Sequence, residues 1–215
     1  MSYRGITDKL KSDEYEYSSD YLTRERRFLF FRGLIMSYGG GFEGRSDPFS
    51  TTVVADDLMT LAMEAPELPI TLFVDGPGGE VANGFTLYDT IRMSPAPIVT
   101  IGLNCASMAS IILVSGHQRY MYPHGKVMLH LPSTVFQGDS DEMDIRNKEI
   151  ARVKDELVGI YIEHGATAGL GKHTSEKKIR NKITRDINKE KWFDAQEAIE
   201  YGLIDGLATK EMIYG

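Results

Sequence analysis

Residues 69–93 read PITLFVDGPGGEVANGFTLYDTIRM, which is the pattern of a strand, a glycine turn and a helix in one run. The apolar stretch at 69–74 is short and typical of a strand covered on both faces of a sheet. Glycines in the DGPGG segment allow a tight turn that bulkier residues would block. The chain then predicts a helix over residues 81–93. This order is the building unit of an α/β fold.

The same order appears on both sides of this run. Upstream, RFLFFRGLI at 27–35 is rich in aromatic and aliphatic residues and favours a strand. Apolar side chains then recur at intervals of three and four over residues 50–65, which predicts a helix. Downstream we expect a buried strand at 98–103 and a helix at 107–115. The alternation predicts a parallel sheet wrapped in helices.

The C-terminal half adds a long helix to this pattern. Two short strands, 118–122 and 126–131, are expected on either side of a Pro-His-Gly turn. An apolar stripe predicts one long helix over residues 139–164. The small and polar residues 165–178 predict a loop. Residues 193–207 predict a capped helix followed by a short strand.

Length and composition indicate one globular domain. The 215 residues fit a single α/β domain, and 42% hydrophobic against 26% charged residues is enough apolar surface to bury a core. Residues 1–22 mix charged residues, Ser and Tyr without an apolar period, so we expect an N-terminal arm there. The domain itself is expected over residues 23–215.

Charge and cysteine content exclude several classes of protein. With 24 Lys and Arg against 31 Asp and Glu, the formal charge is −7, so the chain lacks the basic surplus that nucleic-acid binding needs. The single cysteine cannot form an intramolecular disulfide. The longest apolar runs are about half of the ~20 residues that cross a bilayer, and the polar N-terminus does not resemble a signal peptide. We therefore expect a cytoplasmic protein that neither spans a membrane nor binds nucleic acid.

Two segments at predicted strand ends are candidates for chemistry. The glycine turn DGPGG can aim backbone amides at a negative charge, although it can also be a plain tight turn. Ser107 lies where a buried strand meets a helix, so the next amides are free to bind an oxyanion and Ser107 can act as a nucleophile. The alternative is that Ser107 only caps the helix.

His130 is the candidate base. It closes an apolar strand in KVMLHLP and therefore lies near the carboxyl edge of the sheet, where α/β folds place their ligands. A core histidine without a catalytic role is the alternative. No HExxH or CxxC spacing and no nucleotide-binding glycine fingerprint occurs, so we expect neither a metal nor a cofactor.

Together these segments resemble the ClpP family, the proteolytic subunit of the Clp protease. The resemblance covers residues 22–208. It is carried by LTRERRFLFFRGLI, VDGPGGEVANGFTLYDTI, ASMAS, VMLHLP, FQGDSDEMDIRNKEI and DAQEAIEYGLIDGL. It implies a ClpP/crotonase-like spiral of ββα units, with a protruding handle helix at about residues 131–164.

The resemblance also implies roles for particular residues. Ser107 would be the nucleophile and His130 the general base, with the amides of Gly79 and Met108 as the oxyanion hole. A gapless alignment places Glu190 where the family has the aspartate of its catalytic triad. Asp186, one helical turn earlier, is the substitute. The alternative is that both acids are surface charges.

By the same resemblance the chain is a serine endopeptidase subunit that cuts unfolded polypeptides inside two stacked heptamers. An AAA+ unfoldase would deliver them, docking near the N-terminal arm. Glutamate in place of aspartate motivates a second hypothesis, a weakly active or structural subunit of a mixed ring. A third is a crotonase-type acyl-CoA enzyme, which shares the architecture and the oxyanion hole.

Overall fold

The computed structural model describes residues 21–36, 51–132, 140–171 and 173–215. A six-stranded sheet forms its centre, in the order β1-β2-β3-β4-β5, with β6 paired to β4. Neighbouring strands among β1 (Phe28–Ile35), β2 (Ile70–Gly79), β3 (Ile98–Ala106) and β4 (Gln118–Leu129) are parallel, as expected. β6 (Gly206–Leu207) is also parallel to β4, whereas β5 (Lys191–Asp194) is antiparallel to it. The sheet is therefore mixed at one edge and not purely parallel.

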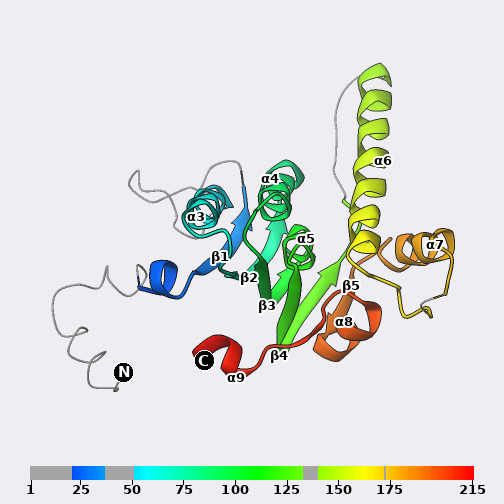
Figure 1. The fold of residues 1–215 in the computed structure, drawn as a ribbon. Helices are drawn as coiled ribbons and strands as arrows, with labels where there is room; N and C mark the ends of the chain where they lie inside the picture. Colours follow the sequence, from blue (N-terminus) through cyan, green and yellow to red (C-terminus); the bar gives the residue numbers. More distant parts are fainter. Residues whose placement is uncertain (1–20, 37–50, 133–139, 172) are drawn as a thin grey trace.

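Three helices cover one face of the sheet (Figure 1). They are α3 (Thr51–Glu64), α4 (Val81–Arg92) and α5 (Met108–Val114), within one or two residues of the predicted bounds. All seven residues of α5 are buried, because this helix packs on β2 and β3 beneath α4 and α6. Strand and helix alternate as the sequence predicts, and the fold is the mixed α/β architecture of the expected class. The DGPGG segment, expected as a tight turn after a strand at 69–74, instead continues β2 to Gly79, because its glycines pair with the ends of β1 and β3 across register shifts.

The alternation of side chains along β1 divides the core into two clusters. Leu29 and Phe31 join the large cluster under the helices, whereas Phe28 faces the other side with Phe73 of β2. Phe30 stacks on the Phe73 ring at a centroid distance of 4.9 Å. The smaller cluster is bordered by η1 (Tyr21–Glu25) and α9 (Lys210–Tyr214) through Leu22 and Ile213. Successive strand residues point to opposite faces, so one strand serves both clusters.

β4 corrects the expectation of two short strands at 118–122 and 126–131. The structure has one strand, because pairing with β3 resumes after a register shift. Gly102 pairs with Met121 and Asn104 with Lys126, so the Pro-His-Gly segment is bulged out of a continuous strand. A bulge accommodates extra residues without ending the ladder. The C-terminal end of β4 therefore remains aligned with the end of β3.

Helix α6 (Ser140–Glu163) extends away from the body of the molecule (Figure 1). Its base is buried through Leu157, Val158 and Tyr161, while its outer part is exposed. The predicted handle at about 131–164 includes residues 133–139, which lie outside the described residues, as do residues 1–20 of the predicted arm. Within the described ranges, no helix combines the length and apolarity needed to cross a membrane.

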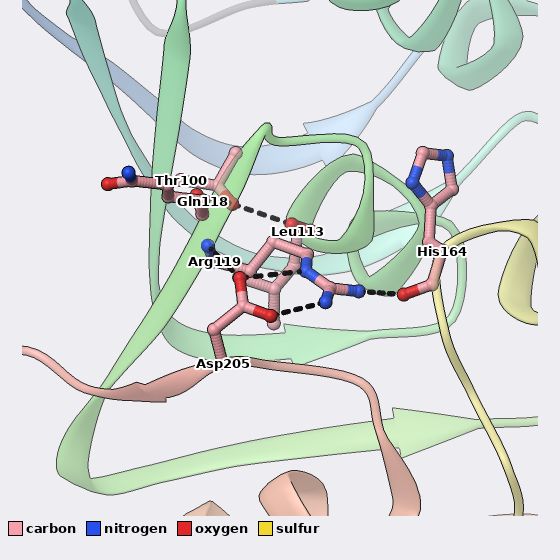
Figure 2. A network of polar contacts seen from close by, with 6 residues as sticks. All are labelled: Thr100, Leu113, Gln118, Arg119, His164 and Asp205. Carbon is pink, nitrogen blue, oxygen red and sulfur yellow. Dashed lines mark hydrogen bonds and ion pairs between the residues drawn. The ribbon is translucent and has the colours of Figure 1, made fainter. Parts of the chain in front are cut away.

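An ion-pair network anchors the end of α6 to the sheet. The Arg119 guanidinium lies between the Asp205 carboxylate and the carbonyl oxygen of His164, to both of which it donates hydrogen bonds (Figure 2). The Arg119 amide donates to the same carboxylate at 2.8 Å. Since carbonyl groups at a helix C-terminus carry partial negative charge, a cation suits this position. The inner end of α6 is therefore tied to the sheet, and Arg180 of α7 adds an ion pair with Asp155 further along the helix.

The secondary structure of the last third of the chain agrees only in part with the prediction from the sequence. Residues 165–178 were expected to be a loop, but the last three belong to α7 (Glu176–Asp186), for which no helix was predicted. Ile183 is buried and Ile179 is partly buried in α7, and their spacing of four was the available signal for a helix. The residues around them are almost all charged or polar, which favoured a loop instead. α8 (Ala195–Tyr201) has the expected cap, a reciprocal capping box between Asp194 and Glu197.

Leu113→Ala tests the role of α5 in the core. Leu113 is fully buried against the sheet, so removing its side chain should lower the free energy of unfolding by roughly 2–5 kcal/mol. Urea denaturation measures this loss. Met93→Ala, at a side chain 84% exposed just after α4, is the control and should stay within about 0.5 kcal/mol of the parent. Equal stability of the two variants would contradict the packing described.

Candidate active site

Ser107 occupies a strained turn between β3 and α5. Its backbone has φ 54° and ψ −124°, in a region that residues other than glycine rarely adopt. The Ser107 amide donates to the carbonyl oxygen of Met128 in β4 at 2.8 Å. Such strain persists only where the surroundings impose it, and it is typical of a nucleophile on a sharp strand-to-helix turn. The Ser107 side chain accepts no helix-capping hydrogen bond, so capping is not its role here.

The bond to Met128 places Ser107 beside the end of β4. Met128 itself stands two residues before His130 in the sequence. There Ser107 Oγ lies 2.7 Å from His130 Nε2. These residues are 23 positions apart in the sequence and meet because the ends of β3 and β4 are adjacent. With Nε2 unprotonated, the serine hydroxyl donates to the ring. This is the geometry in which an imidazole can accept the proton of an attacking serine.

The glycine turn lies against the other side of Ser107. Gly78 has φ 95°, and a Cβ atom there would come within 2.7 Å of both Ser107 Cβ and the Met108 nitrogen. Gly79, with φ 146°, pairs with Ile35 at the end of β1. Glycine is thus required at both positions, since a side chain at Gly78 would collide with the Ser107 turn and one at Gly79 with the backbone of Ile35.

One pocket contains four of the six predicted site residues. It has a volume of about 760 Å³, and Gly79, Ser107, Met108 and His130 all line it. The rest of the lining is largely apolar and comes from the end of β1, the start of α4, α5, the segment after β4 and α6: Leu34, Ile35, Met36, Glu80, Val81, Ala82, Ile111, Pro132, Glu149, Ile150, Val153, Leu157 and Tyr161. A hydroxyl, an imidazole and two backbone amides around an apolar pocket suit acyl transfer from an extended chain.

The two candidate acids are bonded elsewhere. The Asp186 carboxylate accepts hydrogen bonds from Lys182 at 2.6 Å, Lys191 at 3.0 Å and Tyr201 at 3.1 Å. Burial alone would raise the pKa of Asp186, but these three donors outweigh it and hold the pKa below its usual value. Asp186 therefore ties α7 to β5 and α8.

Glu190 is exposed and accepts a hydrogen bond from Trp192 Nε1 at 3.2 Å. The antiparallel ladder pairs Met128 with Trp192 and Leu129 with Lys191, so the next position across from His130 is that of Glu190. Among the described residues, the His130 ring has one hydrogen bond, the one with Ser107. The structure thus joins Ser107 to His130 and leaves both acids unbonded to that ring.

Sequence reasoning missed two residues beside the serine. The Ser110 hydroxyl donates to the Ser107 carbonyl oxygen at 2.6 Å and lies 2.8 Å from the Tyr161 hydroxyl of α6. Ser110 stands in the ASMAS segment, where the spacing of three from Ser107 was the available signal. Tyr161 is 51 positions further on, and no local pattern connects it to this turn.

Metal ligands do not gather in the part of the chain that the structure describes, which contains no group of three or more His, Cys, Asp or Glu side chains suited to an ion. Cys105 is buried two residues before Ser107, and its thiol donates to the Val74 carbonyl oxygen at 3.2 Å. Burial raises the pKa of this thiol, which keeps it protonated.

Comparison with known proteins gives one consistent result. A family model described as Clp protease matches residues 42–211. The chain is 34% identical over 167 residues to an ATP-dependent Clp protease proteolytic subunit of Porphyromonas gingivalis, covering 76% of this chain and 70% of the relative. It is 33% identical over 155 residues to proteolytic subunit 2 of Corynebacterium efficiens, covering 71% and 72%. With the corresponding subunit of Deinococcus radiodurans it shares 34% over 159 residues, covering 73% and 72%.

Asp186→Asn tests the anchor around α7. Because the pKa of Asp186 is lowered in the folded state, its charge should stabilise the fold above the unfolded pKa of about 3.9, and this contribution should disappear as the pH falls through the folded pKa. At neutral pH we expect the variant to lose roughly 1–2 kcal/mol in urea denaturation.

The control is Asp155→Asn, whose carboxylate also pairs with a cation, the Arg180 guanidinium, but is 76% exposed. A change within about 0.5 kcal/mol is expected there. If the difference between Asp186→Asn and the parent persisted undiminished below about pH 3, the charge of Asp186 would not be its source.

Proposed function

The chain belongs to the Clp protease family, and on that premise we propose that it is a serine endopeptidase subunit that hydrolyses unfolded polypeptides. The observation that carries the proposal is the 2.7 Å contact between Ser107 Oγ and His130 Nε2 in the apolar pocket. The strained backbone of Ser107 supports it, because such strain is retained at sites where it serves a function.

The proposed reaction begins when His130 removes the proton of the Ser107 hydroxyl as its oxygen attacks a substrate carbonyl carbon. The amides of Gly79 and Met108 donate to the oxygen that becomes negatively charged, which lowers the barrier by several kcal/mol in comparable sites. The imidazolium of His130 then protonates the leaving amine, and the peptide bond breaks. Water, deprotonated by His130, hydrolyses the acyl-serine and restores the hydroxyl.

For the third group of the triad we propose Glu190. Its position across from His130 on the β4–β5 ladder supports this choice. Rotation of its side chain away from Trp192 would bring the carboxylate toward the second ring nitrogen, where it would fix the tautomer. Asp186 is the weaker candidate, since three donors already share its carboxylate.

The assembly is also proposed from the family. Two stacked heptamers would enclose the sites, and an AAA+ unfoldase would thread substrates into them in the cytoplasm. The exposed Met143 and Ile145 on the outer part of α6 support a partner there, because apolar side chains on a projecting helix are stabilised by burial. Enclosure would limit an unselective peptidase to chains that are delivered to it.

A second candidate function is a structural subunit of a mixed ring. The observation that favours it is the absence, among the described residues, of a hydrogen bond between His130 and either acid. A crotonase-type acyl-CoA enzyme is less well supported, since that chemistry needs neither the strained serine nor its bond to an imidazole.

Ser107→Ala tests the nucleophile. The assembled parent protein should react with a fluorophosphonate probe at Ser107 and cleave a fluorogenic peptide. The variant should lose labelling, and turnover should fall by about 10³-fold or more. Ser115→Ala, at the other end of α5, is the control and should retain both. An unlabelled parent together with unchanged turnover in Ser107→Ala would remove the peptidase proposal.

Glu190→Gln tests the third group. Loss of the carboxylate should reduce kcat by about 10²-fold or more with little change in KM, because the imidazole loses its orienting partner. Asp186→Asn should retain kcat per folded molecule and lose stability instead. The reverse outcome, with activity depending on Asp186 and not on Glu190, would transfer the role to Asp186.

A further inference from the structure

We infer that Ser110 and Tyr161 are positioning residues whose hydroxyl groups connect α6 to the Ser107 turn and hold Ser107 in its reactive conformation. Neither residue touches the proposed reacting atoms, so each acts through the Ser107 backbone. The inference rests on the proposed function of Ser107. It adds to that function a physical link between the projecting helix and the nucleophile.

The need for such a link comes from the backbone of Ser107. A non-glycine residue with φ 54° and ψ −124° relaxes unless its peptide groups are held on both sides. On one side the Ser107 amide donates to the Met128 carbonyl oxygen at 2.8 Å. On the other side the Ser107 carbonyl oxygen accepts two bonds from Ser110, from its amide at 3.0 Å and from its hydroxyl at 2.6 Å.

The hydroxyl hydrogen atoms of Ser110 and Tyr161 determine which group donates in each of these hydrogen bonds. A carbonyl oxygen only accepts, so the single hydroxyl hydrogen of Ser110 is used toward Ser107. The 2.8 Å contact between Ser110 Oγ and the Tyr161 hydroxyl therefore requires Tyr161 to donate. The relay runs from Tyr161 through Ser110 to the carbonyl group of Ser107.

Burial makes the relay difficult to replace. Ser110 is fully buried and Tyr161 is 3% exposed, so bulk water cannot supply the missing donor if either hydroxyl is removed. Burial also raises the pKa of the Tyr161 hydroxyl, which stays protonated and able to donate at working pH. The bond between Ser110 and Tyr161 is thus shielded from solvent, and the bond from Ser110 to the Ser107 carbonyl is part-buried.

The position of Tyr161 connects the relay to the rest of the molecule. It lies near the base of α6, the helix that extends from the body (Figure 1), and it lines the pocket together with Ser107. A displacement of α6 would act first on the Tyr161 hydroxyl and then, through Ser110, on the turn. The reactive conformation of Ser107 consequently depends on where α6 lies.

The test compares two variants with two matched controls in the assembled protein. Tyr161→Phe and Ser110→Ala each remove one hydroxyl of the relay. Ser115→Ala is the matched serine, fully buried on the same helix and donating three residues back to Ile112 at 2.7 Å. Tyr88→Phe is the matched tyrosine, whose hydroxyl bonds His164 just beyond α6 at 2.9 Å.

Two readouts are measured, peptide turnover per folded molecule and hydrogen exchange of the Ser110 amide. In Ser110→Ala and Tyr161→Phe we expect kcat to fall about tenfold with KM within about twofold, since misplacement affects the chemical step more than binding. The residue-110 amide should exchange faster in both. The double variant should match the larger single effect, because both residues act in one chain. The controls should change neither readout.

Unchanged kcat and unchanged exchange in the relay variants would overturn the inference. So would equal losses of stability in all four variants with kcat per folded molecule preserved, which is the result of a purely structural role. If the parent protein itself is neither labelled nor active, the proposed function fails. The exchange readout still decides whether the relay holds the turn.

Discussion

The backbone of Ser107 is the constraint on which the site depends. Its unfavourable dihedral angles are imposed from three directions, by the Met128 carbonyl in β4, by Ser110 in α5 and by the close approach of Gly78 in β2. The contacts with Met128 and Gly78 come from other strands, whereas the contact with Ser110 is made within the first turn of α5. The serine hydroxyl can meet His130 only after the sheet, the helix and the glycine turn have all formed.

β4 connects this site to the projecting helix. At its end it leads into His130 and supplies the carbonyl that holds Ser107. Near its start, Arg119 joins Asp205 to the carbonyl at the inner end of α6 (Figure 2). A bulge lies between these two regions of β4. It accommodates the extra residues while the pairing with β3 continues on both sides of it, so the same strand reaches both regions. The site and the base of α6 are therefore supported by the same strand.

The two candidate acids differ in their surroundings. Glu190 lies one position beyond the last β4–β5 pair, Leu129 with Lys191, and its carboxylate accepts a hydrogen bond from Trp192, two residues away. The Asp186 carboxylate is paired with two lysines and accepts a further hydrogen bond from a tyrosine, so it stabilises the packing of α7. These environments make Asp186 an anchor for the fold and leave Glu190 as the candidate for catalysis.

The sequence by itself determined the order of strands and helices from β1 to α5 and the capped helix at Asp194, because these depend on periodicity and on local backbone chemistry. It also indicated Ser107 and His130, since both stand at the ends of apolar strands. It did not lead to α7, in which two isoleucines spaced by four stand among charged and polar residues. Only the tertiary structure decided the antiparallel edge strand, the continuous β4, the partners of Glu190 and Asp186, and the contact of Tyr161 with Ser110. These depend on distances between segments far apart in the chain, which local patterns do not encode.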